Sequence, residues 1–258
     1  MRICRFNSLE FEAPRFGVID GDQIRSLRQS KGLEAFPSFT SEEPIPIAMV
    51  QLIAPIAPTK IVCVGRNYKD HAAELGNPMP PEPLLFLKAP SAIIGDHEAI
   101  VLPPQSSQVE HEGELGVVIG RTARQLSDGE DALSYVLGYT CANDITARDL
   151  QRQDVQFTRA KSFDTFCPVG PFIETEVDPS DLQVTTRVNG DVRQTGRTSA
   201  MAFPVDHLIR YISRIMTLHP GDLISTGTPA GVSVLHDGDV VEVEIAGVGT
   251  LSNPVVQM

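Results

Sequence analysis

The chain has 258 residues, with 41% hydrophobic and 21% charged residues, which is ordinary for a soluble globular protein. This length predicts one large domain, or a main domain with a small appendage, and enough apolar residues for a sizeable core. The net charge of −12 argues against nucleic acid or an anionic membrane surface as the main partner. An acidic protein that handles an anionic substrate needs local cations, either a metal ion or placed lysines and arginines.

The four cysteines are scattered and form no Cys-x-x-Cys pair, which is typical of the reduced thiols of cytosolic proteins. The first residues contain no apolar signal-peptide core, and no apolar run approaches membrane-spanning length. We therefore expect a cytoplasmic protein.

The N-terminal part predicts a small β-rich unit. Residues 16–22 indicate a short strand closed by an Asp-Gly turn, and residues 37–58 contain five prolines, typical of an irregular passage between two units. We therefore predict a small domain over residues 1–57 and a main domain over residues 58–258.

The segment 109–120 carries the strongest functional pattern. Residues 115–119 form an apolar, partly β-branched run that predicts a buried strand, and strand spacing places Glu112 and Glu114 on one face. Two such carboxylates repel each other and lose hydration, so a cation between them would make the pair tolerable. Hard oxygen ligands favour Mg²⁺, Mn²⁺ or Ca²⁺ over Zn²⁺. A solvated strand face is the alternative, since Glu-x-Glu also occurs at Glu10/Glu12, Glu174/Glu176 and Glu242/Glu244.

A helical turn after the strand predicted for residues 60–64 carries His71 and Glu74. Residues three apart are neighbours on a helix surface, so this carboxylate can orient and charge-stabilise the imidazole. An incidental exposed pair is the alternative. Four prolines between residues 76 and 83 exclude regular structure and are typical of a loop, which could cover a site.

A second polar group follows the strand predicted for residues 135–142. Asp144, Arg148 and Gln151 lie at i, i+4 and i+7 of a helix predicted for residues 145–153, which would place them on one helical face. A carboxylate, a guanidinium and an amide aimed together suggest a site, whereas a helix N-cap is the structural alternative for Asp144.

Three further features are weaker candidates. Lys161 lies among aromatic residues, where a lysine either extends to solvent or pairs with a carboxylate, and Lys88, after a strand at residues 84–87, is either an anion contact or solvated. The loop 226–231 offers hydroxyls and amides that could hold a carboxylate. Among the remaining histidines, only His111, beside Glu112, is expected near the metal ion.

The clearest helix is predicted for residues 204–216, with Pro204 in its first turn. Short strands are predicted at residues 223–225 and 240–245, and the second is expected to end the sheet. The helix has one apolar stripe that predicts core packing: Val205, Leu208, Ile209, Ile212, Ile215 and Met216.

Five of these segments, in this order between residues 60 and 231, resemble the fumarylacetoacetate hydrolase (FAH) superfamily. Each motif is weak alone, but the ordered set is specific. The motifs are Gly65-Arg-Asn-Tyr-x-x-His71-x-x-Glu74, Glu112-x-Glu114-Leu, Asn143-Asp144-x-Thr-Ala-Arg148-Asp-x-Gln151, Ala160-Lys161-Ser-Phe-Asp and Ser225-Thr-Gly-Thr228-Pro-x-Gly.

The resemblance implies a β-rich α+β fold, an FAH-type mixed β-roll with flanking helices beside the small N-terminal domain, and a homodimer. It implies a Mg²⁺ ion, or Mn²⁺ with Ca²⁺ as a further option, on Glu112, Glu114 and Asp144. It implies catalytic roles for three residues: Lys161 as a cation beside the metal ligands, and His71 with Glu74 as a water-activating or proton-transferring pair on a lid. The implied substrate contacts are Arg66, Tyr68, Arg148, Gln151 and Thr228.

The small members of the superfamily are the most similar, namely acylpyruvate hydrolase/oxaloacetate decarboxylase-like proteins and 2-hydroxyhepta-2,4-diene-1,7-dioate isomerases. A fourth carboxylate ligand has no clear match, and the motifs occur once, so fumarylacetoacetate itself is not the expected substrate. We expect hydrolysis of acylpyruvates or decarboxylation of oxaloacetate, since a metal ion can stabilise the shared enolate of a 2-oxo acid. Dienoate isomerase or hydratase action is the alternative. A silent binding protein with a structural cation is disfavoured by His71, Glu74 and Lys161.

Overall fold

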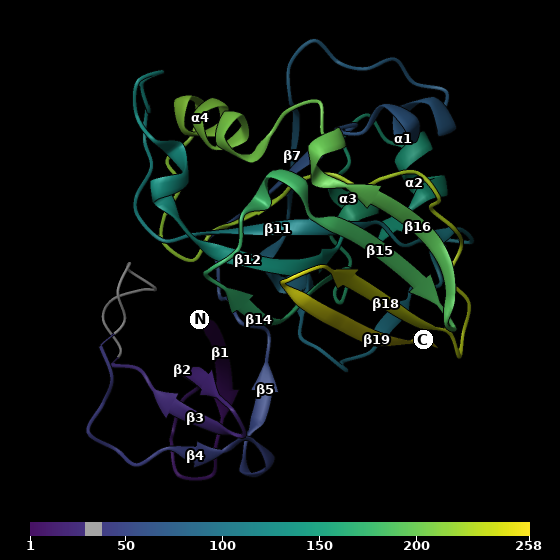
Figure 1. The fold of residues 1–258 in the computed structure, drawn as a ribbon. Helices are drawn as coiled ribbons and strands as arrows, with labels where there is room; N and C mark the ends of the chain where they lie inside the picture. The colour runs from purple at the N-terminus through teal and green to yellow at the C-terminus, as the bar shows by residue number, and fades with distance from the viewer. Residues whose placement is uncertain (29–37) are drawn as a thin grey trace.

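The computed structural model describes residues 1–28 and 38–258, and strands dominate this part of the chain (Figure 1). The largest sheet has the order β4-β3-β2-β1-β14-β12-β11-β17-β6-β7, with β5 beside β1 and β8 beside β14. Its strands are β1 (Arg2–Asn7), β2 (Arg15–Asp20), β3 (Gln23–Ser26), β4 (Ile45–Pro46), β5 (Gln51–Ile53), β6 (Ile61–Gly65), β7 (Leu84–Lys88), β8 (Ile93–Ile94), β11 (Gly113–Ile119), β12 (Val136–Asn143), β14 (Cys167–Glu174) and β17 (Leu223–Ser225).

A second sheet has the order β16-β15-β18-β19-β9, and β10 pairs with β13. These strands are β9 (Ile100–Leu102), β10 (Val109–Glu110), β13 (Thr146–Ala147), β15 (Gln183–Val188), β16 (Asp191–Arg197), β18 (Val240–Ile245) and β19 (Gly249–Gln257). The helices are α1 (Lys69–Glu74), α2 (Arg148–Gln153), α3 (Thr158–Lys161) and α4 (Val205–Ile215), with 3₁₀ turns η1 (Ile47–Met49), η2 (Pro90–Ala92), η3 (Ala132–Tyr135), η4 (Pro179–Asp181) and η5 (Thr198–Ala200). The α+β, β-rich fold expected from the sequence is confirmed.

Strand β11 separates two apolar clusters because successive side chains of a strand point to opposite faces. Leu115, Val117 and Ile119 pack in the cluster that contains the apolar stripe of α4. Val118 packs in the other cluster, and by strand alternation Glu114 lies on the same face of β11 as Val118. The two carboxylates of this segment therefore lie on the face of β11 turned away from α4.

The helix predicted for residues 204–216 is α4, and Pro204 precedes its first turn. Val205, Leu208, Ile209 and Ile212 are buried as expected, whereas Ile215 at the last turn is 57% exposed. Ile215 therefore lies off the buried stripe, whereas Met216, which directly follows α4, is partly buried against the same apolar cluster.

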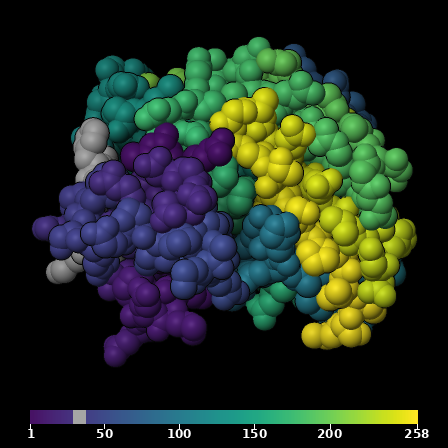
Figure 2. Space-filling model, turned by 60° about the horizontal axis from the view of Figure 1, so that its bottom comes forward, coloured from purple at the N-terminus to yellow at the C-terminus, as the bar shows by residue number. Residues whose placement is uncertain are grey.

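The N-terminal strands continue the main sheet. Strands β2 and β3 form the hairpin expected at the Asp-Gly turn, where Gly21 has a φ of +62° that favours glycine. Strand β1 pairs with β14 of the main body, with Arg2 opposite Glu174. In the space-filling view these strands gather at one end of the molecule (Figure 2). The division at residue 57 stays a prediction.

Two sequence predictions about element boundaries are wrong. The helix predicted from residue 145 begins only at Arg148, after the short strand β13, and its N-cap is Ala147, so Asp144 is not a cap. The strand β18 does not end its sheet, because β19 pairs along its free side. Within residues 1–28 and 38–258, no helix is long and apolar enough to cross a membrane.

Candidate metal and substrate site

Strand pairing brings three carboxylates together at one end of β11. Gly113 lies opposite Asn143 of β12, and beyond this pair the amide of Asp144 donates to the carbonyl of Glu112 at 2.9 Å. Asp144 therefore lies across from Glu112, and alternation puts Glu114 on the same face. One oxygen from each of the three side chains lies within 4.8 Å of the others, and all three residues are buried.

These carboxylates suit a divalent cation. Burial, together with the negative charges of Asp144 and Glu112, raises the pKa of Glu114 to about 8, because three buried carboxylates repel one another. A bound cation would remove this repulsion, and three carboxylate ligands match the hard divalent ions. The residues present therefore fit a metal ion of that class.

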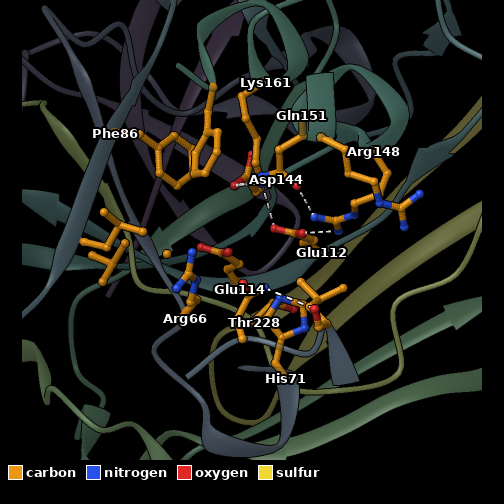
Figure 3. A pocket seen from close by; sticks show the side chains of 17 residues that line it. Arg66, His71, Phe86, Glu112, Glu114, Asp144, Arg148, Gln151, Lys161 and Thr228 are labelled. Carbon is orange, nitrogen blue, oxygen red and sulfur yellow. Dashed lines mark hydrogen bonds and ion pairs between the residues drawn. The ribbon is translucent and has the colours of Figure 1, made fainter. Parts of the chain in front are cut away.

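Two lysines neutralise part of this charge, and Figure 3 shows one of them, Lys161, beside Asp144 and Glu112. Lys161, the last residue of α3, donates to Glu112 Oε2 at 2.8 Å and to Asp144 Oδ2 at 2.6 Å. Lys88, at the end of β7, donates to Asp144 Oδ1 and to the carbonyl of Ile145. Both lysines are 2% exposed, so the alternative of a solvent-directed side chain is wrong for each. Pairing with a carboxylate is correct for Lys161, whose pKa is raised because the two carboxylates outweigh the opposing effect of burial.

Arg148, the first residue of α2, fixes Glu112 from the other side. Its Nε donates to Glu110 Oε2 at 2.7 Å, its Nη2 donates to Glu112 Oε1, and its Nη1 donates to Gln151 Oε1 at 2.6 Å. Arg148 therefore orients a carboxylate of the triad as well as facing the cavity. Glu110 is a site residue that sequence reasoning missed, although it alternates with Glu112 and Glu114 and so carried the same signal.

His71 and Glu74 come together on α1 as predicted, with 3.3 Å between His71 Nδ1 and Glu74 Oε2. His71 is only 5% exposed and lines the cavity, so the alternative of an incidental exposed pair is wrong. Glu74 also accepts from the amide of Gly231 at 3.0 and 3.2 Å, which ties α1 to the loop after β17. The carboxylate is thereby held in place to orient the imidazole.

The triad faces a cavity of about 250 Å³. Its polar wall includes Arg66, His71, Arg148, Gln151, Lys161 and Thr228, which Figure 3 shows around the three carboxylates. Its apolar wall includes Phe86 and Phe157, whose rings pack edge to face at 5.7 Å. The residues 77–83 form no regular element, as expected, and Asn77 lines the cavity.

The structure does not bring every candidate to this cavity. Tyr68 is 3% exposed and packs in the apolar cluster around Leu115, outside the cavity lining. His111 is fully buried and contacts Gln194 and Ser233 rather than the triad, so the expectation that it lies at the metal site is wrong. Its side chain points away because His111 alternates with Glu112.

The loop after β17 binds a carboxylate, but this carboxylate is the side chain of Glu114 and not a substrate group. The hydroxyl of Ser225 and the amide of Gly227 both donate to Glu114 Oε2. Thr228 lines the cavity, while its hydroxyl donates to the carbonyl of Gly113 at 2.8 Å. The loop therefore positions a triad residue and contributes one cavity wall.

A buried carboxylate triad, flanked by cations and open to a small cavity in a β-rich fold, defines a class of proteins that can hold a divalent ion beside a small anionic ligand. Residues 60–256 match the family model described as fumarylacetoacetate (FAA) hydrolase C-terminal, and residues 1–55 match one described as Rv2993c-like, N-terminal. The chain belongs to the fumarylacetoacetate hydrolase family.

The relatives include proteins named as enzymes. Protein Rv2993c of Mycobacterium tuberculosis is 52% identical over 265 residues, covering 100% of this chain and 98% of that protein. Oxaloacetate tautomerase FAHD2A, a mitochondrial protein of Homo sapiens, is 44% identical over 225 residues, covering 82% of this chain and 71% of that protein. The crystal structure of 5-carboxymethyl-2-hydroxymuconate delta-isomerase from Mycobacterium smegmatis has a TM-score of 0.92 at 44% identity and covers 100% of both chains. These relatives support an enzymatic function.

Proposed function

We propose that this protein is a Mg²⁺- or Mn²⁺-dependent enzyme that moves a proton on a small 2-oxo diacid, in a keto–enol or double-bond isomerisation that passes through an enolate. The observation that carries the proposal is the buried triad of Glu112, Glu114 and Asp144, with Lys161 beside it, facing a cavity of about 250 Å³. A cavity of this size suits a small acid. The overall charge of −12 makes these local cations necessary for an anionic ligand.

A divalent ion held by the triad would stabilise negative charge that develops on the keto oxygen of the substrate. The chain supplies the remaining functions. His71, oriented by Glu74, is the imidazole placed at the cavity to take and return a proton, which contributes on the order of 10²–10⁴-fold. The guanidinium of Arg66 lines the same cavity and can hold a substrate carboxylate.

Two of the relatives, at 44% identity each, are named as a tautomerase and an isomerase, and this favours proton transfer over bond cleavage. Hydrolysis of acylpyruvates remains the second candidate, with decarboxylation of oxaloacetate, because the same His71–Glu74 pair could activate a water molecule. The reactions share an enolate, so the carboxylate triad alone does not separate them.

The test is to strip the protein with a chelator, reload it with Mg²⁺ or Mn²⁺, and measure three rates. These are enol-to-keto conversion of oxaloacetate, release of CO₂ from oxaloacetate, and cleavage of an acylpyruvate. We expect metal-dependent enol-to-keto conversion, lowered on the order of 10²–10⁴-fold by His71→Ala. Decarboxylation needs no base and should be largely spared in that variant. Full activity in excess chelator would contradict the metal dependence, and equal losses in all three rates would contradict the assigned role of His71.

A further inference from the structure

Gln194, on β16, lies outside the cavity lining, yet both the oxygen and the nitrogen of its buried side-chain amide form hydrogen bonds. Its Nε2 donates to Thr228 Oγ1 and to the carbonyl of Pro229, both at 2.7 Å. Its Oε1 accepts from the amide of Gly113 at 3.0 Å and lies 3.1 Å from His111 Nδ1. An amide with no exposed surface and four partners on two segments, residues 111–113 and 228–229, fixes both segments relative to β16.

The segment that Gln194 holds, residues 225–231, reaches both parts of the site. At its start, Ser225 and Gly227 donate to Glu114 of the triad. At its end, the amide of Gly231 donates to both oxygens of Glu74, the partner of His71. Gln194 contacts this loop between the two ends, at Thr228 and Pro229.

Strand β16 also constrains the far end of the loop. Gly231 has a φ of +104°, and a Cβ atom there would lie 2.0 Å from the carbonyl oxygen of Arg193, the neighbour of Gln194. The backbone of β16 therefore packs directly on Gly231, where only glycine fits. Through Gln194 and this contact, one strand sets the position of the loop along its length.

We propose that Gln194 is a positioning residue that couples the carboxylate triad to the His71–Glu74 pair through the loop 225–231. The inference has two measurable parts, and the first, the effect of Gln194 on metal binding, rests on the proposed cation site. The second part, the effect of Gln194 on local stability, concerns only how α1 is held against the loop. Both parts can be measured without a substrate.

The test variant is Gln194→Glu, which keeps the shape and the acceptor of the side chain. It replaces the donor with an oxygen that faces the carbonyl of Pro229, so the loop loses its attachment. We expect Mn²⁺ to bind on the order of 10-fold more weakly in calorimetric titration, as for loss of an interaction that orients a metal ligand. The added negative charge alone would strengthen cation binding, so this weakening has the opposite sign to a simple charge effect.

The second readout is amide hydrogen exchange without metal. We expect exchange in α1 and in residues 225–231 to become roughly 10-fold faster, with β18 and β19 unchanged, because local opening is decoupled from global unfolding. The matched control is Gln183→Glu, which adds the same charge at an exposed glutamine of β15 and should leave both readouts as in the wild type. Gln194→Met removes the same bonds without burying a charge and should reproduce both effects.

Wild-type affinity and unchanged local exchange in the Gln194 variants would overturn the proposal. A uniform rise in exchange that includes β18 and β19, or a failure of both variants to fold, would show a purely structural role and would overturn it too. If the wild type binds no Mn²⁺, the proposed function fails, and the exchange of α1 and the loop then decides the inference alone.

Discussion

At the scale of single residues, cationic side chains of the protein offset part of the negative charge of the carboxylate triad. Lys161 is shared between Glu112 and Asp144, and Arg148 contacts the second oxygen of Glu112. Burial alone would raise the pKa of Glu112, but the charges of Lys161 and Arg148 outweigh it and hold the pKa well below the usual range. This carboxylate therefore stays ionised and ready to bind a cation.

Lys161→Met should abolish most of the activity while leaving the protein folded. The change removes the cation between Glu112 and Asp144, and the remaining carboxylates repel each other unless a metal ion is bound. We expect kcat to fall by at least about 100-fold, with a circular dichroism spectrum like that of the wild type in the presence of Mg²⁺. Lys69→Met, at an exposed lysine of α1, is the control. Wild-type kinetics in folded Lys161→Met would remove Lys161 from the mechanism.

The sequence and its family resemblance predicted the triad and Lys161 beside it, but not the roles of Lys88 and Gln194. Local alternation indicated Glu112 and Glu114 as a metal-binding pair, whereas Asp144 joined them only through the family resemblance. Lys88 lies 56 residues before its partner Asp144, and the partners of Gln194 lie up to 83 residues away. Such pairs depend on strand order, which one sequence does not reveal, and an isolated lysine or glutamine is usually solvated.

At the scale of elements, the site depends on how closely β11 packs on β15. A Cβ atom on Gly113 would lie 2.0 Å from the hydroxyl of Thr186 on β15, too close to be accommodated without a shift. Because Gly113 lies between Glu112 and Glu114, that shift would displace both glutamates.

Gly113→Ala should therefore weaken Mn²⁺ binding on the order of 10-fold and lower the free energy of unfolding by about 1–3 kcal/mol. Titration calorimetry and urea unfolding measure the two effects. Gly129→Ala is the control, because nothing lies within 4 Å of a Cβ atom there. Unchanged metal affinity in Gly113→Ala would mean that the sheets can separate without moving the triad.

Asp222 joins the start of β17 to the segment before β6. Its side chain has no exposed surface and accepts from the amides of Thr59, Lys60 and His219 and from the ammonium of Lys60. Burial opposes ionisation, but these donors, led by Lys60, outweigh it and lower the pKa below the ordinary 3.8. A lowered carboxyl pKa stabilises the fold above the unfolded-state value, and this stabilisation is lost as the pH falls through the folded-state value.

Asp222→Asn should lower the free energy of unfolding by about 2 kcal/mol at pH 7, because one backbone donor then faces an amide donor. The difference from the wild type should shrink below pH 3.8, where the unfolded-state carboxyl is protonated. Urea unfolding across this range checks both points, with Asp164→Asn, at an exposed aspartate, as the control. A difference that does not change with pH would show that the charge of Asp222 does not contribute.

Elements were predicted correctly where a hydrophobic pattern extends over many residues. They were predicted incorrectly where pairing with a distant strand sets the local backbone conformation. The apolar stripe of α4 and the alternation in β18 were found from local pattern. The start of α2 was placed three residues too early because residues 146 and 147 pair with β10, and this pairing keeps the backbone extended despite a sequence suited to a helix.

At the scale of the whole molecule, the homodimer implied by the family resemblance and the cytoplasmic location stay predictions. A dimer should give a mass twice that of the 28.0 kDa chain in sedimentation equilibrium at micromolar concentration. The matching measurement at nanomolar concentration should show whether the association is tight. A monomer at both concentrations would contradict the prediction.

The pairing of β1 with β14 covers an edge of the main sheet. Strand β14 lies between β12 and β1, so removing the N-terminal strands would leave a row of backbone donors and acceptors without partners. Such an open edge is a template for other strands, and the apolar residues that pack on it, such as Phe172, would be uncovered with it. The N-terminal segment thus covers an edge of the main sheet, and we expect a chain without this segment to aggregate more readily than the whole chain.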